Sequence, residues 1–479
     1  MLEGTKDRVA PESDRSTRAV RVSEIFSRVL KRVKPAKPEV AEERAFARKI
    51  IKRLHEAIPH DIGVELVGSI AKDTHLKGDR DVDIFLLFPK GTSREDLVKK
   101  GLDYAKKALK PGEKWQVGYA EHPYLKAEIE GYEVELVPCY KIREIMDKAS
   151  SADRSPLHCR YVLEFLTEAE CDEVRLLKAF LKRHGVYGAE VRTEGFSGYL
   201  CELLIIEFRK FETLLREAAA WGGVPVLDPE NHHADKEALR AKFPLASMIA
   251  IDPVDPDRNV AAAVSADSLA RFMLAARAFI KNPSEEHFIM KKEEVGAAGL
   301  ERLRKKFEAR GTRLIALEFK APEVIEDVLW PQLRKAANNF ATRLEEKGFR
   351  LFDSGYWSDE KICLMLFEFE VAELPAIQKV LGPDVKHAKA CEDFANAHKK
   401  ALAGPWVEGG RMAAAEPREW RRAVDLVEEI TGHPAKYGIP SHIAKAITGF
   451  ERLEPSTLFS EKYSEFMLKY VEKKEILSA

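Results

Sequence analysis

The sequence GSIAKDTHLKGDRDVDIFLLF, from Gly68 to Phe88, decides the fold of the N-terminal half of this chain. The apolar runs Val64–Val67 and Val82–Phe88 predict two strands, joined by a glycine-serine turn and a short polar segment. Because alternate residues of a strand share a face, Asp81 and Asp83 are expected side by side. Two carboxylates on one sheet face repel each other unless a cation lies between them. This stretch therefore predicts a cation site at the start of a central strand.

A third carboxylate is predicted from the next pair of strands. The runs Tyr124–Glu130 and Tyr132–Val137 flank Gly131, which is typical of a hairpin. Glu133 and Glu135 share one face of the second strand. If this strand neighbours the first one, Glu135 completes a cluster of three acids.

The chemistry that suits such a cluster is metal-dependent phosphoryl transfer. Three oxygen donors, here Asp81, Asp83 and Glu135, suit hard divalent cations. Two such ions about 3.5–4 Å apart promote in-line displacement at phosphorus. Gly68 lets the backbone approach a phosphate, and Ser69 offers N–H and O–H donors to it. A lone D-x-D pair is usually a solvated surface feature, but the preceding turn and the third acid make the pattern far more specific.

Length and composition indicate a multidomain globular protein. The chain has 479 residues, of which 45% are hydrophobic and 33% charged, and its net charge is −1. We expect three or four domains, and a nucleic-acid partner would need a local basic patch. The six cysteines include no C-x-x-C pair, which argues against disulfides or structural zinc and favours a cytoplasmic location. Neither a membrane span nor a signal peptide is expected.

The remaining patterns predict an α+β protein with a helical centre. The helix Asp172–His184 carries an apolar stripe and a basic stripe of Arg175, Lys178 and Lys182. We expect Arg175 and Lys182 on a solvated face, which Lys178 could share. From Gly311 to Gly382 the order strand, helix, strand, strand, helix predicts a ferredoxin-like or RRM-like module, with its long helix at Pro331–Lys347. The predicted regions are a flexible extension (1–22), an α/β catalytic part (23–150), a helical part (151–300), the RRM-like module (301–388) and a helical tail (389–479).

The segment Gly68–Phe88 resembles the nucleotidyltransferases of the polymerase-β superfamily. Further motifs resemble the archaeal (class I) CCA-adding enzymes within it, and the match covers nearly the whole chain from about residue 23. The motifs are Ala120–Tyr124, Val137–Tyr140, Ser155–His158, Glu173–Lys182, Gly185–Glu190, Gly195–Leu200 and Asp252–Asp255.

This resemblance implies a polymerase-β-like palm that adds C, C and A to the 3′ end of tRNA from CTP and ATP with two Mg²⁺ ions. It implies that Asp81, Asp83 and Glu135 bind the metal. Residues implied to contact the nucleotide are Gly68, Ser69, Lys72, His158, Lys178, Tyr187 and Arg258. It also implies contact with the acceptor stem and T-arm of tRNA through the C-terminal regions, a possible homodimer and no membrane partner.

Two departures from the family pattern leave alternatives open. Glu135 stands where we expect Asp, and Lys72 stands where we expect Arg, so the third carboxylate is displaced by a methylene and a bidentate phosphate contact is lost. A poly(A) polymerase or another terminal nucleotidyltransferase would share the acids, and a catalytically silent RNA-binding protein could keep the scaffold. Without the family resemblance, His158 could simply cap a helix and Arg258 could simply hold a loop in place.

Overall fold

The computed structural model describes residues 12–119, 123–289 and 296–473, and for 12–19 the backbone alone. Ala120, Glu121 and His122, which begin one of the motifs, lie outside the described residues. The chain divides into two compact units, and among the described residues the first unit ends at Ile289 and the second begins at Gly296. The two units are described separately below.

The first unit begins with a five-stranded sheet that carries the predicted acids. Its strands lie in the order β1-β2-β5-β4-β3, and β2 and β5 are parallel whereas the other neighbours are antiparallel. They are β1 (Gly63–Val67), β2 (Asp81–Phe88), β3 (Lys114–Tyr119), β4 (Pro123–Ile129) and β5 (Tyr132–Tyr140). The turn between β4 and β5 falls at Gly131, whose φ of +79° is readily adopted by glycine. The hairpin is therefore confirmed.

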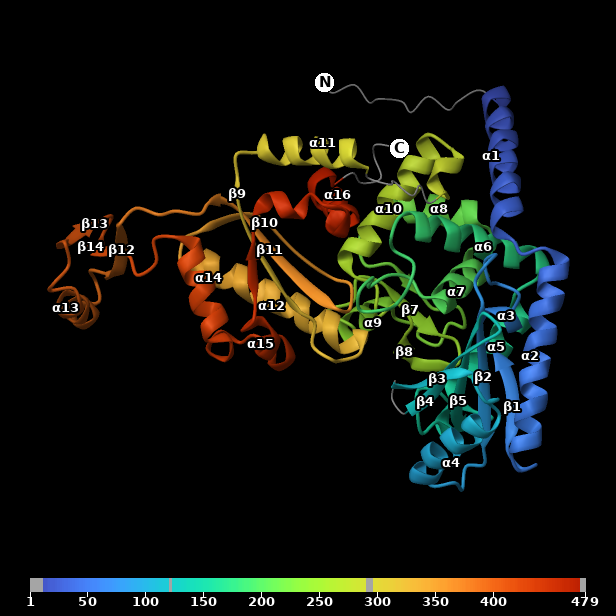
Figure 1. Cartoon of the computed structure of the whole chain (residues 1–479). Helices are drawn as coiled ribbons and strands as arrows, with labels where there is room; N and C mark the ends of the chain where they lie inside the picture. Colours follow the sequence, from blue (N-terminus) through green and yellow to red (C-terminus); the bar gives the residue numbers. More distant parts are fainter. Residues whose placement is uncertain (1–11, 120–122, 290–295, 474–479) are drawn as a thin grey trace. The chain divides into compact units, whose positions relative to one another are not determined.

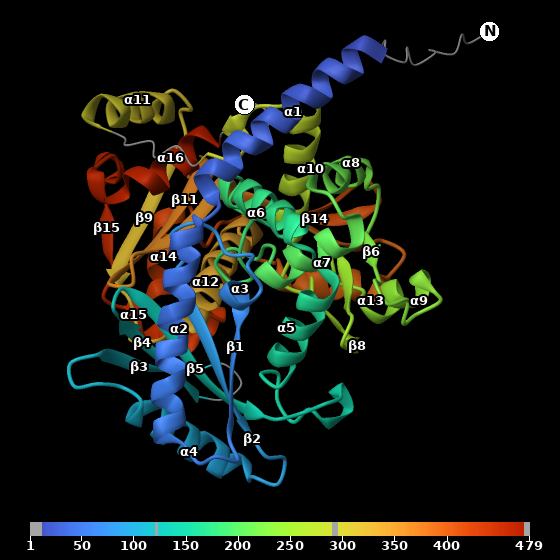
Figure 2. The same cartoon turned by 90° about the vertical axis from the view of Figure 1, so that its right-hand side faces the viewer.

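One face of this sheet is buried under two helices, α2 (Lys37–Ala57) and α4 (Arg94–Lys107) (Figure 1; Figure 2). Val82, Ile84 and Leu86 of β2 are each 0% exposed and pack against these helices. Because strand residues alternate, Asp81 and Asp83 lie on the opposite face. The apolar run after the acids thus fixes which way they point.

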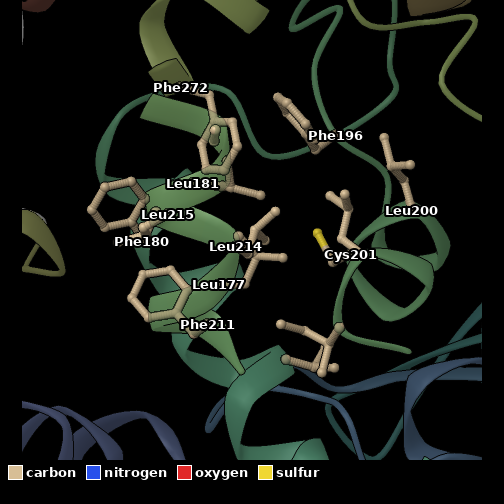
Figure 3. Packing of buried hydrophobic residues seen from close by; sticks show 14 of the residues in the cluster. Leu177, Phe180, Leu181, Phe196, Leu200, Cys201, Phe211, Leu214, Leu215 and Phe272 are labelled. Carbon is tan, nitrogen blue, oxygen red and sulfur yellow. The ribbon is translucent and has the colours of Figure 1, made fainter. Parts of the chain in front are cut away.

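Helices make up the rest of the first unit. They surround an apolar cluster in which Leu177, Phe180 and Leu181 of α6 meet Phe211 and the other side chains drawn in Figure 3. The helices are α1 (Glu12–Val33), α5 (Arg154–Phe165), α6 (Glu168–Arg183), α7 (Gly198–Phe208), α8 (Phe211–Ala220), α9 (Lys236–Lys242) and α10 (Ala266–Lys281). A small sheet of β6 (Val226–Leu227), β7 (Ile249–Asp252) and β8 (Asp255–Asn259) adjoins them. Within the extension predicted at 1–22, the helix already begins at Glu12, while residues 1–11 lie outside the described part.

The second unit contains a ferredoxin-like sheet. Its strand order β10-β11-β9-β15, with every neighbouring pair antiparallel, is the arrangement that a βαββαβ chain adopts. The strands are β9 (Arg313–Lys320), β10 (Arg350–Ser358), β11 (Ile362–Val371) and β15 (Glu451–Leu453). The predicted module is confirmed, but β15 lies far beyond residue 388, so the sheet closes inside the region predicted as a helical tail.

Both faces of this sheet are covered by helices (Figure 1). Residues of α12 (Glu326–Glu346), α14 (Ala423–Gly432) and α15 (Ser441–Ile447) cover one face, and residues of α11 (Ala297–Glu308) and α16 (Ser464–Glu472) cover the other. An RRM binds RNA on an open sheet face. The described sheet has no such face, so the likeness to an RRM is one of topology alone.

Three sequence predictions for the second unit are wrong. The predicted helix before Gly382 is the strand β12 (Ile377–Asp384), which pairs with β14 (Arg411–Pro417), itself paired with β13 (Ala403–Glu408). The segment 389–479 therefore contains strands as well as α13 (Ala388–Ala397) and later helices. Pro331 lies inside α12 instead of starting it. In the part of the chain that the structure describes, no helix is both long and apolar enough to cross a membrane.

Candidate active site

The parallel pairing of β2 with β5 brings the predicted acids together. The register places Asp81 beside Glu133 and Asp83 beside Glu135. The antiparallel partner on the other side of β2 places Val67, the last residue before the glycine-serine turn, beside Asp83. Four carboxylates from two strands thus share one patch of the sheet, directly below the turn.

Gly68 is required where it stands. Its φ is +74°, and a Cβ atom added to it would lie 1.9 Å from Oδ2 of Asp83. Both the backbone conformation and the lack of space exclude a side chain here. Gly68 therefore lets the turn close onto the carboxylate of Asp83.

A cleft of about 370 Å³ opens at this patch. It is lined by five carboxylates and two lysines, among other residues: Gly68, Ser69, Lys72, Asp81, Asp83, Glu133, Glu135, Lys178, Tyr187, Gly198, Tyr199 and Glu202. Burial, together with the charges of Glu135 and Asp81, raises the pKa of Asp83 to about 7. Burial also raises the pKa values of Asp81 and Glu135. Ionising these carboxyl groups in the cleft is therefore costly, and a bound cation would lower that cost.

The donor chemistry of the cleft fits a hard divalent cation, because oxygen ligands from neighbouring carboxylates are what such ions bind. Among residues 12–119, 123–289 and 296–473, however, no three His, Cys, Asp or Glu side chains form a closed ligand set. Lys126 of β4 instead pairs with Glu133 and lies 3.7 Å from Glu135. The acids are neighbours whose charge is partly balanced by one lysine.

The segment between the turn and β2 is held by the basic stripe of α6. Arg175 binds Asp73 (2.7 Å) and the carbonyl of His75 (3.0 Å), and Lys178 donates to the carbonyl of Thr74 (2.9 Å). Lys182 completes the series with Asp79 at 3.0 Å. Arg175 and Lys178 are each 1% exposed, so the prediction that Arg175 lies on a solvated face is wrong. Burial lowers the pKa of Lys178.

Lys72 is tied to the helical part by a buried carboxylate. Its Nζ donates to Oε2 of Glu202 on α7 at 2.5 Å, and Thr74 Oγ1 donates to Oε1 of the same residue at 2.6 Å. Tyr187 and Tyr199 add ring surface to this wall of the cleft. The wall therefore combines two ammonium groups with aromatic rings, as expected of a nucleotide site.

His158 and Arg258 do not line the cleft but gather on another buried carboxylate. Asp252 is 0% exposed and accepts from His158 (2.8 Å), Arg258 (2.8 Å) and Tyr199 (3.1 Å). Burial opposes ionisation of Asp252, but the bonds from His158 and Arg258 lower its pKa to about 2. The ring of His158 stacks on Tyr199 at 4.1 Å between centroids. Tyr199 therefore joins this cluster to the cleft.

The structure brings eight of the ten predicted site residues to the cleft. Of the other two, His158 contacts the lining residue Tyr199, and Arg258 is connected to Tyr199 through Asp252. Sequence reasoning missed the parts played by Glu202 and Tyr199. Tyr199 lay within a quoted motif, but its contacts come from distant segments. Glu202 sits in an apolar helix, where an isolated acid was the available signal.

Comparison with known proteins agrees with this geometry. Three family models match successive parts of the chain: the nucleotidyltransferase domain (47–163), the second domain of tRNA nucleotidyltransferase (172–289) and the C-terminal domain of the CCA-adding enzyme (310–451). The five-stranded sheet, its acids and the first of these matches define a nucleotidyltransferase with a polymerase-β-like fold.

Curated relatives narrow the class to one family. The CCA-adding enzymes of Methanoregula boonei (38% identity, 91% of this chain and 94% of the relative), Methanothermobacter thermautotrophicus (35%, 92% and 96%) and Methanocaldococcus jannaschii (37%, 88% and 94%) match along nearly their whole length. The chain belongs to the archaeal CCA-adding enzyme family. A solved cytoplasmic RNA terminal U-transferase is similar at 15% identity and a TM-score of 0.43, covering 55% of this chain and 95% of its own, a level that supports no conclusion about activity.

Proposed function

We propose that this chain adds and repairs the 3′-terminal CCA of tRNA from CTP and ATP, without a nucleic-acid template, and releases pyrophosphate. The observation that carries the proposal is the register of β2 and β5, which sets the acids Asp81, Asp83 and Glu135 side by side beneath the Gly68 turn. Its family membership supplies the RNA substrate. We assign these three acids as ligands of two Mg²⁺ ions.

The Mg²⁺ ions would lower the pKa of the attacking 3′-hydroxyl and neutralise the triphosphate and leaving pyrophosphate. The chain's own groups do the positioning. Gly68 leaves room for phosphate oxygens, and Ser69 donates hydrogen bonds to them. Lys72 and Lys178 supply positive charge on the facing wall of the cleft. Because carboxylates outnumber lysines there, we expect a triphosphate to bind tightly only together with divalent cations.

Selection of the incoming base is assigned to the cluster around Asp252. His158 and Arg258 carry hydrogen-bonding groups. His158 stacks on Tyr199 of the cleft wall, and Arg258 is linked to Tyr199 through Asp252. Tyr187 contributes ring surface to the cleft itself. We propose that Arg258 recognises the base edge while Tyr187 and His158 contact the nucleotide.

We propose that the second unit binds the acceptor stem and T-arm of tRNA. Because helices cover both faces of its ferredoxin-like sheet, this contact would use helix surfaces, loops and the small sheet of β12–β14. A-form RNA is read mostly by shape and backbone, which suits an enzyme acting on every tRNA. We further propose a cytoplasmic location and a homodimer. We retain 23–150 as the catalytic domain and 151–300 as the recognition domain.

The test uses tRNA transcripts that end at the discriminator base, at C and at CC, with Mg²⁺ and labelled CTP or ATP. Ordered addition of C, C and A followed by a stop is expected. Long A tails would instead indicate a poly(A) polymerase, and tRNA binding without incorporation would indicate a silent RNA-binding protein. Asp83→Ala should abolish incorporation, whereas Asp61→Ala, a change at an exposed acid before β1, should leave it unchanged.

A further inference from the structure

Glu202 is a buried acid in a place where an acid is unexpected. It lies on α7, is 1% exposed, and lines the cleft to which we assign an anionic triphosphate. Its neighbours on the helix, Cys201 and Leu203, are buried and apolar. A buried carboxylate costs free energy unless its partners are well placed, so its presence calls for a role.

The partners of Glu202 come from the catalytic turn. One oxygen accepts from Lys72 Nζ at 2.5 Å and the other from Thr74 Oγ1 at 2.6 Å. Thr74 is 0% exposed, and its backbone carbonyl accepts from Lys178. Lys72 and Thr74, which follow the Gly68-Ser69 turn, are thus both held by one carboxylate from another part of the fold.

We infer that Glu202 is a positioning residue for nucleotide binding, which holds the ammonium group of Lys72 in the cleft before the triphosphate arrives. The inference rests on the proposed function, because it takes the triphosphate as the ligand of Lys72. Glu202 itself need not touch the substrate.

The chemistry of lysine supports this role. A free lysine side chain loses rotamer entropy when it is immobilised. Its ammonium group carries three donors, and Glu202 takes one of them. The other two can donate to phosphate oxygens without breaking the bond to Glu202. This bond therefore orients Lys72 and leaves it able to bind the triphosphate.

Repulsion between Glu202 and the triphosphate acts in the opposite direction. It is weakened because both carboxylate oxygens already accept a hydrogen bond, one from the ammonium group of Lys72 and one from the hydroxyl group of Thr74. Hydrogen bonds to charged groups contribute more to stability than those between neutral groups. Removing the charge of Glu202 is therefore expected to weaken nucleotide binding, because the weaker bond to Lys72 outweighs the reduced repulsion of the triphosphate.

The test measures equilibrium binding of CTP and ATP with Mg²⁺ to the full chain, along with the KM for nucleotide and for tRNA. Glu202→Gln keeps the size of the side chain but removes its charge. We expect the nucleotide Kd and KM to rise about tenfold, in line with loss of a charged hydrogen bond, while the KM for tRNA stays unchanged. The control is Glu43→Gln, which alters another buried glutamate (6% exposed) that pairs with His75 and does not line the cleft.

A double-mutant cycle with Lys72→Met tests whether Glu202 affects nucleotide binding through Lys72. If Glu202 acts through Lys72, Glu202→Gln should change the nucleotide Kd less than twofold in the Lys72→Met background. Equal effects in both backgrounds, or tighter binding by Glu202→Gln alone, would overturn the inference. Failure of the unaltered chain to bind either nucleotide would instead refute the proposed function.

Discussion

Replacing Gly68 with alanine tests whether the conformation of the turn sets the position of the Asp83 carboxylate. The new Cβ would lie 1.9 Å from Oδ2 and 2.9 Å from Cγ of Asp83, so the carboxylate must retreat by about 1 Å. A displacement of about 1 Å in a catalytic group can cost about 100-fold in rate. The positive φ of +74° adds about 1–2 kcal/mol of backbone strain for any residue other than glycine. We therefore expect kcat to fall about 100-fold.

Gly78 provides the matched control for this experiment. It has a similar φ of +87° and lies in the same connection, but a Cβ atom there would meet no atom within 4 Å. Gly78→Ala should show the strain alone, as a loss of about 1–2 kcal/mol in urea unfolding, with kcat within about twofold of the unaltered enzyme. Single-turnover incorporation of CMP measures the two variants. Equal kcat values for Gly68→Ala and Gly78→Ala would refute the link between the turn and Asp83.

The acid cluster and the interior of the first unit lead to three further predictions. Glu135→Ala should lose turnover by at least about 100-fold while Glu135→Asp retains most of it, and normal turnover of the alanine variant would exclude a metal role. Arg175→Met should cost about 3 kcal/mol in urea unfolding, because it removes a buried guanidinium group from Asp73 and from the carbonyl of the buried His75. Lys182→Met, which removes a more exposed cation, should cost less than about 1 kcal/mol. Burial lowers the pKa of His287 to about 4, so the unfolded chain takes up a proton first as the pH falls below 6.5. Stability should then drop by about 2 kcal/mol from pH 7 to pH 5 through this group, and His287→Phe should remove that part of the drop.

The acid cluster could be predicted from the sequence because it depends on local rules. The period of two in a strand places Asp81 and Asp83 on one face of their strand, and it places Glu133 and Glu135 on one face of the second hairpin strand. Only the neighbouring position of β5 had to be assumed. The structure supplies that neighbour, with Asp83 opposite Glu135.

The second unit shows where such rules stop. The periodicity of the sequence predicts the order of β9, α12, β10 and β11. The fourth strand, β15, has only three residues and pairs with β9 across more than a hundred intervening positions. No local sequence pattern predicts a strand partner so far along the chain. The strands β12 to β14 alternate weakly and expose much of their surface, so they carry little of the signal that marks a buried sheet.

The basic stripe of α6 shows why a correct pattern can lead to the wrong environment. Spacing of three and four residues places Arg175, Lys178 and Lys182 on one helix face, and charge alone suggests that this face meets water. The face instead meets the connection 73–79, whose carbonyl groups and aspartates accept from all three. A polar connection inside a fold must satisfy its backbone groups, and this one does so with cations from another segment. The geometry of the glycine-serine turn is therefore set partly by α6 and α7. Substitutions on those helices should change catalytic activity by displacing residues 73–79.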